Sequence, residues 1–238
     1  MSPARKKNDT RVEEPAPEFK PGDRRDVSVL PVRHTVLFPF ALLPLNVGRP
    51  GSVQLLNQSM ASGRTLAVFA QRDATTESPS VADLHPVGTF ATVLRMVRSG
   101  DNQLAVLVQG MARVRIVEPI ALEPWIRCRI EFLADQEVDD VETDALVKNV
   151  VAQFERVVEL SPTVPDEAVA AARQQSTRGR NADFIASLLD FQVDDKQRLL
   201  EALDVKQRLK LLTEILAREL QVLEIGRASC RERVYVLV

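Results

Sequence analysis

Two periodicities divide the sequence. In the front half apolar residues alternate with charged ones, most clearly over 126–132, where every second residue is apolar. A period of two is typical of a β-strand with one buried face. Beyond Asp135 the apolar residues recur every three or four positions, as from Leu146 to Val158, which is the period of an amphipathic helix. The pattern therefore predicts an α+β protein, with a β-rich half over 26–135 and an all-α half over 136–225.

The β-rich half is predicted to hold about six short strands and one helix, which indicates a small closed or half-closed barrel. The short apolar segment over 65–70 is followed by a polar loop over 72–80, and the composition of 99–102 is that of a hairpin loop. The helix is expected over 52–60, and the extended segments over 36–38, 41–47, 65–70, 87–97, 103–108, 114–116 and 126–132.

An apolar stretch interrupted by prolines, residues 30–50, organises this half. Pro31, Pro39 and Pro44 each lack a backbone donor and fix φ near −65°. None of them suits the middle of a helix or of a central strand. We therefore expect a bent ribbon that wraps the edge of the barrel, with Pro39 and Pro44 protecting that edge from further strand pairing.

The back half is predicted to be a bundle of five helices. The first covers 146–158, the second is a short alanine-rich helix over 165–175, and a break follows at 178–180. A third covers 184–189, Asp194 and Gln197 resemble a capping box for a fourth, and Asp204 caps the fifth. The fifth runs to Ile225 and is apolar over much of its girth, which indicates burial within the bundle or, alternatively, contact between subunits.

The two ends of the chain lack such patterns. Residues 1–25 mix charge, proline and small polar residues, and are expected to be a disordered tail. Residues 226–238 do not continue the helical pattern and resemble vector-encoded sequence. No signal peptide and no apolar run long enough to span a bilayer is found, so we expect a cytoplasmic protein without membrane contact.

Charge and cysteine content narrow the function classes. Residues 26–135 carry ten basic and nine acidic side chains, whereas 136–225 carry eleven and eighteen. This acidity argues against nucleic acid as a general partner. Cys128 and Cys230 are far apart and only two histidines are present, so no disulfide framework, metal site or cofactor is expected. Cys128 falls on the buried face of its strand and is interpreted as a structural thiol.

Several stretches in order resemble the N-terminal domain of ATP-dependent Lon proteases, and together they cover about residues 26 to 225. They read LPVRHTVLFPFALLPLNVGRP (30–50), TLAVFAQRDA (65–74), VGTFATVLRM (87–96), VLVQGMARVRIVE (106–118), ADFIASLLDF (182–191) and EALDVKQRLKLLTEILARELQVLEI (201–225). The resemblance implies a PUA-like pseudo-barrel followed by helices. It also implies a module that recognises unfolded or damaged polypeptides and supports the hexamer of the protease.

Catalytic chemistry is not expected from this chain alone. The sequence has no GxxxxGK[ST] phosphate loop, and the serine-lysine protease module of full-length Lon enzymes has no counterpart. Nothing positions a nucleophile beside His34, which is interpreted as a surface or turn histidine. We therefore predict no catalytic, cofactor-binding or metal-binding residues.

Polypeptide binding remains as the leading hypothesis, with the apolar residues of the ribbon as its surface: Leu37, Phe38, Phe40, Leu42 and Leu43. An alternative is a free-standing Lon-domain interaction protein. A third is an RNA-binding PUA-like protein, which would use four arginines expected at outward strand positions: Arg113, Arg115, Arg127 and Arg129.

Overall fold

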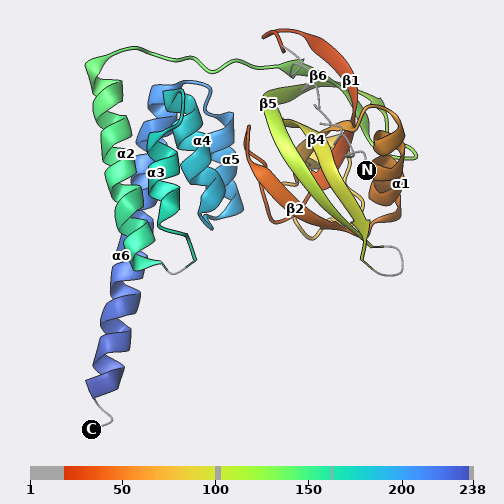
Figure 1. Cartoon of the computed structure of the whole chain (residues 1–238). Helices are drawn as coiled ribbons and strands as arrows, with labels where there is room; N and C mark the ends of the chain where they lie inside the picture. The colour runs from red at the N-terminus through yellow and green to blue at the C-terminus, as the bar shows by residue number, and fades with distance from the viewer. Residues whose placement is uncertain (1–18, 100–102, 162, 236–238) are drawn as a thin grey trace, which may run out of the picture.

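The computed structural model describes residues 19–99, 103–161 and 163–235, and over 226–235 the backbone alone. Figure 1 shows two parts side by side, a curled β-sheet and a helical bundle, joined by one extended connection. We call them the barrel subdomain (β1 to β6) and the helical subdomain (α2 to α6). The expected α+β class with a pseudo-barrel before the helices is confirmed.

Six strands form one sheet in the order β2-β5-β4-β3-β1-β6. The strands are β1 (Arg24–Val32), β2 (Leu42–Val47), β3 (Thr65–Ala70), β4 (Val87–Arg98), β5 (Leu104–Ala121) and β6 (Arg127–Phe132). All neighbours are antiparallel except β1 and β3, which are parallel. The long strand β5 also pairs with β6, so the sheet curls strongly. It is not a closed barrel, because within the described residues β2 pairs only with β5 and keeps one free edge.

The prolines lie where the sheet tolerates them. Pro44 lies opposite Leu107 on the edge strand β2. Pro31 lies in the second half of β1, which pairs with β3 alone, since β6 pairs with β1 only as far as Ser28. A proline removes one ladder donor, and this does little harm where the second edge of a strand has no neighbour. The ribbon thus follows the open side of the barrel, but Pro39 lies in a turn before β2, so the prediction that it protects the strand edge is wrong.

One predicted extended segment is wrong. Residues 36–38 form no strand but pass irregularly beneath the sheet, and their side chains are buried. The carbonyl of Leu37 accepts a hydrogen bond of 2.5 Å from the Thr89 hydroxyl. Side-chain partners of this kind satisfy backbone groups that a strand would otherwise pair.

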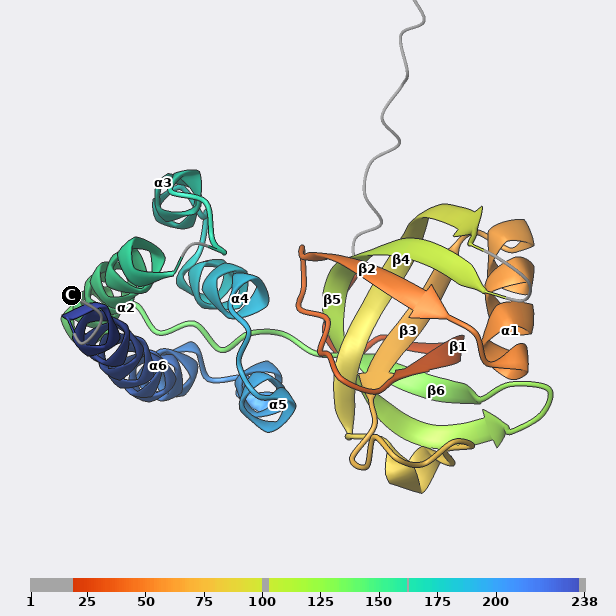
Figure 2. The same cartoon turned by 90° about the horizontal axis from the view of Figure 1, so that it is seen from below.

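Apolar side chains fill both sides of the curled sheet. Helix α1 (Pro50–Ala61) lies against β1 and β3, remote from the helical subdomain (Figures 1 and 2), and buries Leu55 and Leu56. A short 3-10 helix, η1 (Val81–Asp83), precedes β4. Cys128 is buried as expected, and burial raises the pKa of its thiol to about 11, so it is held as the unreactive thiol.

The helical subdomain comprises α2 (Val141–Leu160), α3 (Glu167–Arg173), α4 (Arg178–Leu188), α5 (Val193–Glu201) and α6 (Val205–Tyr235). Helices α2 and α6 pack side by side, and α6 projects beyond the bundle (Figure 1). Asp204 caps α6 as predicted, because its carboxylate accepts from the amides of Lys206 and Gln207. Within the described residues, none of the helices is long and apolar enough to cross a membrane.

Four expectations about boundaries need correction. Strand β1 begins at Arg24, so the ordered chain starts before residue 26, and Phe19 already stacks on Phe132 with ring centroids 4.7 Å apart. Residues 1–18 of the expected tail lie outside the described residues. The expected break at 178–180 is the first turn of α4, where Thr177 caps the helix. Gly179 is required there by close packing, since an added Cβ would lie 2.4 Å from an Asp135 oxygen.

The other two corrections concern helix ends. No capping box forms at Asp194, because α5 begins at Val193 and its N-cap residue Gln192 makes no side-chain cap. Helix α6 does not end at Ile225 but continues to Tyr235. Arginine, alanine and glutamate in 226–235 favour helix, and an exposed helix needs no apolar stripe to continue a helix already formed.

Candidate functional site

Phe40 is the most unusual residue of the predicted site. Its φ is 64°, in the left-handed region, where a bulky side chain is disfavoured, and its ring is 52% exposed. Two hydrogen bonds hold this turn: the Phe40 amide donates to the Gly110 carbonyl at 3.0 Å, and the Gly110 amide donates to the Ala41 carbonyl at 2.9 Å. Backbone strain beside an exposed aromatic ring is typical of functional positions.

Gly110 makes this arrangement possible. A Cβ at this position would lie 2.2 Å from the Phe38 carbonyl oxygen, so only glycine lets β5 approach the turn so closely. Phe38 itself is fully buried and anchors the turn from below. The Phe40 ring therefore points outward because Phe38 is anchored in the core and Gly110, on the facing strand, has no side chain.

A groove of about 630 Å³ runs beside Phe40, between the barrel subdomain and the first turn of α4. Figure 2 shows the loop between β1 and β2 on the side of the barrel that faces α4. The Arg180 guanidinium carbon lies 3.6 Å from the centre of the Phe40 ring, a cation–π contact across the groove. The apolar residues that line this groove, which we call the Phe40 groove, are Phe19, Pro39, Phe40, Met111, Ala112 and Leu133.

An ionic cluster lies at the inner end of the groove. It consists of Arg113 on β5, Asp135 after β6, Asp183 on α4 and Arg208 on α6. Arg113 donates to Asp183 at 2.5 Å and to Asp135 at 3.0 Å. Arg208 contacts both oxygens of Asp135, at 2.7 and 3.0 Å, and Asp183 at 3.3 Å. Two carboxylates thus neutralise two guanidinium groups, and the cluster joins the two subdomains.

Three of the four members of the cluster are buried, whereas the Asp135 side chain is 25% exposed. The exposed fractions of Arg113, Asp183 and Arg208 are 4%, 2% and 0%. Burial opposes ionisation of Asp135, but the hydrogen bonds and charges of the two arginines outweigh it and hold the pKa of this carboxyl below its ordinary value. Each guanidinium also donates to a backbone carbonyl, namely Leu200 for Arg113 and Ala202 for Arg208.

The connection between the subdomains is fixed as well. The Gln136 amide donates to the Leu203 carbonyl at 2.8 Å, and the Val205 amide donates to the Gln136 carbonyl at 3.1 Å. Residues 136–139 of this acidic segment are exposed, whereas Asp135 faces the junction, where two arginines match its negative charge. The geometry of the Phe40 groove thus rests on a rigid junction rather than on a free linker.

The structure separates the five predicted site residues. Leu37 and Phe38 are 2% and 0% exposed and belong to the core, so they cannot form part of an exposed binding surface. Leu43 is half-buried and packs against the same core. Phe40 and Leu42 are 52% and 57% exposed. Along β2 every second side chain turns outward, so the run of apolar letters in the sequence contains both core and surface positions.

The four arginines proposed for RNA are not a free basic surface. Arg113 is buried in the ionic cluster, so the prediction that it points outward is wrong. Arg115 pairs with Glu131 at 2.9 Å, and Arg129 pairs with Asp26 at 2.9 Å. Arg127 alone is exposed without such a partner among the described side chains. Neutralised arginines offer little attraction to a phosphate backbone, so this alternative loses its basis.

Several groove residues were missed by the sequence analysis. Phe19 lies in the segment taken as disordered, and Met111 and Leu133 each lie in a strand or connection without a distinguishing pattern. Arg180 lies in the segment taken as a break. One signal was available for Phe19: it is one of very few large apolar residues in residues 1–25, and an isolated aromatic there indicates an anchor.

Fold and groove together define a two-part α+β domain that presents an apolar surface next to a rigid junction. Comparison with known proteins identifies the class more closely. The family model described as the ATP-dependent protease La (LON) substrate-binding domain matches residues 26–218. This chain belongs to that family.

Its curated relatives are Lon proteases. The chain is 36% identical over 203 residues to the Lon protease of Heliobacterium modesticaldum, covering 85% of this chain and 25% of the relative. It is 40% identical over 218 residues to that of Koribacter versatilis, covering 90% and 27%. The chain thus spans about a quarter of the length of these relatives.

Two solved structures share the fold. The N-terminal domain of the Mycobacterium avium complex Lon protease matches with a TM-score of 0.61 at 20% identity, over 81% of this chain and 98% of that one. The Lon N-terminal domain protein from Xanthomonas campestris matches with a TM-score of 0.55 at 17% identity, over 79% and 96%. At these identities the likeness shows the architecture alone.

Proposed function

We propose that this chain is the substrate-recognition module of a cytoplasmic ATP-dependent Lon serine protease. It binds unfolded or damaged polypeptides for degradation by ATPase and protease modules, and it supports the assembly of the hexamer. The family assignment and the similarity to a quarter of the length of Lon proteases support this proposal. On its own the chain is expected to hydrolyse neither ATP nor peptide bonds.

The observation that carries the proposal is the exposed, strained Phe40 beside an apolar groove. The Phe40 ring costs backbone energy, its one contact described above is the cation–π contact with Arg180, and it is 52% exposed, so it can bury further area against a ligand. Unfolded polypeptides differ from folded ones in presenting apolar side chains in extended backbone. The Phe40 groove offers contact to such side chains without requiring a specific sequence.

The groove residues fit loose recognition. Met111 is unbranched and polarisable, so it adapts to different apolar groups. Arg180 covers the Phe40 ring from one side while its guanidinium also donates to the Ser176 hydroxyl at 3.0 Å. Arg180 is half-buried rather than enclosed, and a substrate side chain can therefore replace it over the ring at modest cost. Shallow and adaptable contact predicts a dissociation constant on the order of micromolar or weaker, about −8 kcal/mol or less in magnitude.

The first experiment is Phe40→Ser in this chain. We expect the affinity for a labelled, chemically unfolded model protein, measured by fluorescence anisotropy, to fall by about fivefold, on the order of 1 kcal/mol. The melting temperature should stay nearly unchanged, because the ring contributes little buried area. Val222→Ser is the matched control: Val222 is 59% exposed on α6, remote from the groove.

Two outcomes would contradict the assignment. If Phe40→Ser unfolds the chain, Phe40 is a structural residue and the groove loses its central contact. If stability and binding both equal those of Val222→Ser, the polypeptide-binding surface lies elsewhere on the molecule.

A further inference from the structure

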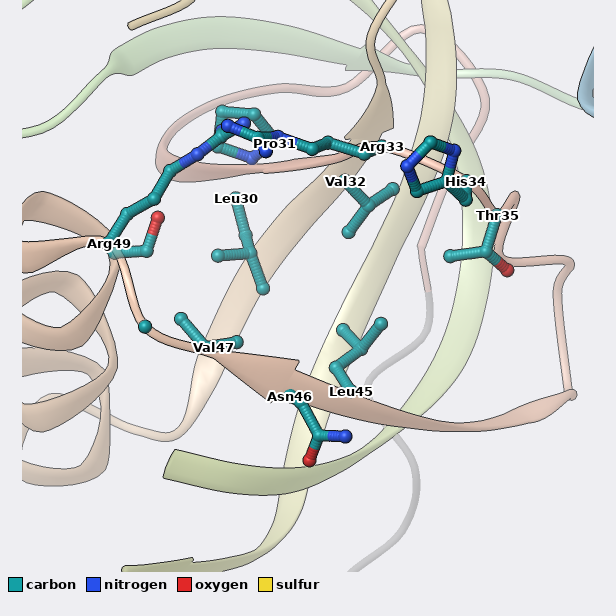
Figure 3. Close-up of a pocket in the computed structure, with 12 residues that line it drawn as sticks. Leu30, Pro31, Val32, Arg33, His34, Thr35, Leu45, Asn46, Val47 and Arg49 are labelled. Atoms are coloured by element: carbon teal, nitrogen blue, oxygen red, sulfur yellow. The ribbon is translucent and has the colours of Figure 1, made fainter. Parts of the chain in front are cut away.

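The open side of the barrel contains a second pocket, formed by the free edge of β2 and the second half of β1. Among the described residues neither edge has a neighbouring strand there, so a gap lies between the two strands in place of paired backbone hydrogen bonds. Figure 3 shows this pocket of about 450 Å³, with β1 residues on one side and β2 residues on the other. It is distinct from the Phe40 groove, and the two share no lining residue.

The inner wall of this pocket is apolar. Leu30 and Val32 from β1 face Leu45 and Val47 from β2 (Figure 3). Leu30, Val32 and Val47 are almost fully buried and belong to the core cluster. A ligand group that reaches the inside of the gap therefore lies against aliphatic side chains, which favours an aliphatic group over a purely polar one.

Two arginines converge on the rim of the pocket. The Arg33 and Arg49 side chains extend toward one another from opposite ends of it (Figure 3). Burial, and then the like charge of Arg33, hold the pKa of Arg49 below its ordinary value, which places the two cations within electrostatic reach. Arg49 is held in position because it donates to the Gln71 side chain at 2.7 Å and to the Thr76 carbonyl at 3.3 Å.

Arg33 has no such support. Its Nε is buried, and it has no hydrogen-bond partner in the part of the chain that the structure describes. A buried guanidinium nitrogen without an acceptor costs free energy, and the charge of Arg49 adds to that cost. An acceptor group carrying negative charge would satisfy the nitrogen and relieve the repulsion at once.

The local charge indicates how much negative charge the pocket takes. Glu77 is the acidic group that acts on Arg49, so the two arginines and this carboxylate leave a net charge of about one positive unit. Helix α1 begins at this place, its first turn holds no acidic residue, and its N-cap residue Arg49 makes no side-chain cap. The uncapped helix N-terminus attracts an anion, and the net charge of about one positive unit favours a ligand with a single negative charge over a phosphate with two.

We propose that this pocket binds a single carboxylate that a polypeptide carries next to an apolar side chain, as at a chain end with an aliphatic last residue. The carboxylate lies between Arg33 and Arg49, and the aliphatic side chain lies against Leu30 and Val47. The inference rests on the proposed function, since it names a chemical feature of the polypeptide, but it uses a surface separate from the Phe40 groove.

The test compares two labelled peptides of the sequence Gly-Ser-Gly-Ala-Leu-Leu, one with a free terminal carboxylate and one amidated. Binding to this chain is measured by anisotropy at low salt, because salt screens charge pairs on the surface. We expect the amidated peptide to bind about tenfold more weakly. A third peptide, amidated but with glutamate before the last leucine, shows whether a side-chain carboxylate serves as well as a chain end.

Arg33→Gln should remove the difference between the acid and the amide. Arg33→Lys should keep part of it, because lysine retains the charge but not the planar fork of donors. Arg98→Gln is the matched control: it removes one exposed positive charge from the end of β4, outside the pocket, and should leave the difference intact. Melting curves of all variants confirm that each is folded.

The proposal is overturned if acid and amide bind equally, if neither binds, or if Arg33→Gln keeps the preference. Displacement of the acid by equimolar inorganic phosphate would also overturn it, since the pocket would then select phosphate. The failure of this site is distinguishable from failure of the proposed function. If acid and amide bind equally while Phe40→Ser still weakens binding of unfolded protein, the carboxylate site alone is wrong.

Discussion

Two pairs of arginines in this molecule differ in whether carboxylates neutralise them. Arg113 and Arg208 lie in the interior, and each contacts both Asp135 and Asp183. Arg33 and Arg49 lie at the open side of the barrel, and among the described residues neither forms a salt bridge. One pair is fully matched and the other is not.

The difference indicates two different roles. Burying a charge is tolerable only when a partner and hydrogen bonds compensate it, so removing a carboxylate from the matched pair should destabilise the fold strongly. A pair of arginines near the surface without carboxylate partners contributes little to stability. A ligand can supply the hydrogen-bond acceptor and the negative charge that the pair lacks. Phe40 also carries a cost that the fold leaves uncompensated, because its backbone is strained and its apolar ring is exposed.

The largest expected effect comes from breaking the matched pair. Asp183→Asn keeps the size of the side chain but removes one negative charge, so the two buried guanidinium groups face Asp135 alone. The free energy of unfolding, measured with urea, should fall by about 3 kcal/mol or more. Asp166→Asn, at an exposed position before α3 whose side chain makes no cap hydrogen bond, should change it by less than about 0.5 kcal/mol. Equal values for the two variants would mean that the cluster is not structural.

The second effect concerns the strained turn at Phe40, where the usual order of stability of alanine and glycine variants should be reversed. Alanine normally stabilises a chain more than glycine does, but at a φ of 64° only glycine is free of steric cost. Phe40→Gly should therefore be more stable than Phe40→Ala, by about 1 kcal/mol. At Leu42, an exposed position in β2, the order should be the usual one, with alanine above glycine. The same order at both positions would show that the turn is unstrained.

The sequence predicted what depends on local pattern. Alternation over 126–132 located β6, and Asp204 was correctly identified as a helix cap, because a strand face and a cap are decided within a few residues. Pro44 was placed on an edge strand from its missing donor alone. The closeness of the match to the Lon domain supplied the overall topology, which no local pattern contains.

The site was harder to predict because it is formed by distant segments. Arg113 alternates with apolar neighbours and looks outward-facing, but its carboxylate partner Asp183 lies 70 positions further along the chain. In the sequence, Leu37, Phe38 and Phe40 are all large apolar residues of one short stretch, and no pattern distinguishes the exposed one from the buried ones. Only the close approach of Gly110 and the positive φ decide that one ring turns outward while the others are buried. Arg33 and Arg49 follow β1 and β2 on opposite sides of the opening of the sheet, and their side chains converge across it (Figure 3).

The third prediction concerns the unmatched arginine itself. Arg33→Gln removes a positive charge that repels Arg49 and that no described carboxylate neutralises. The free energy of unfolding should stay within about 0.5 kcal/mol of the parent value or rise slightly. Arg208→Gln is the opposite case, since it leaves Asp135 and Asp183 with a single cation and should destabilise the chain strongly. A loss at Arg33 as large as that at Arg208 would show that Arg33 is a structural residue.

The smallest expected effect is a pH dependence at the junction, from His85. Its Nδ1 lies 3.6 Å from a Glu201 oxygen, while its Nε2 is buried and has no partner among the described atoms. Burial is the largest influence and lowers the pKa of His85 below its ordinary value, although Glu201 opposes the shift. The neutral imidazole is therefore favoured in the folded state relative to the unfolded one.

The sign of the effect follows from that shift. A histidine whose folded pKa is depressed contributes stability above the unfolded pKa of about 6.5 and loses it as the pH falls through the folded pKa. The free energy of unfolding should thus decline between about pH 7.5 and 5.5, a window in which carboxylates with lowered pKa, such as Asp135, remain ionised. His85→Gln should flatten this decline. His34→Gln, which alters the exposed second histidine, should leave it unchanged. If both variants keep the parent dependence of the free energy of unfolding on pH, the prediction is wrong. The fold would then accept the protonated imidazole of His85 as readily as the neutral one, through an acceptor for Nε2.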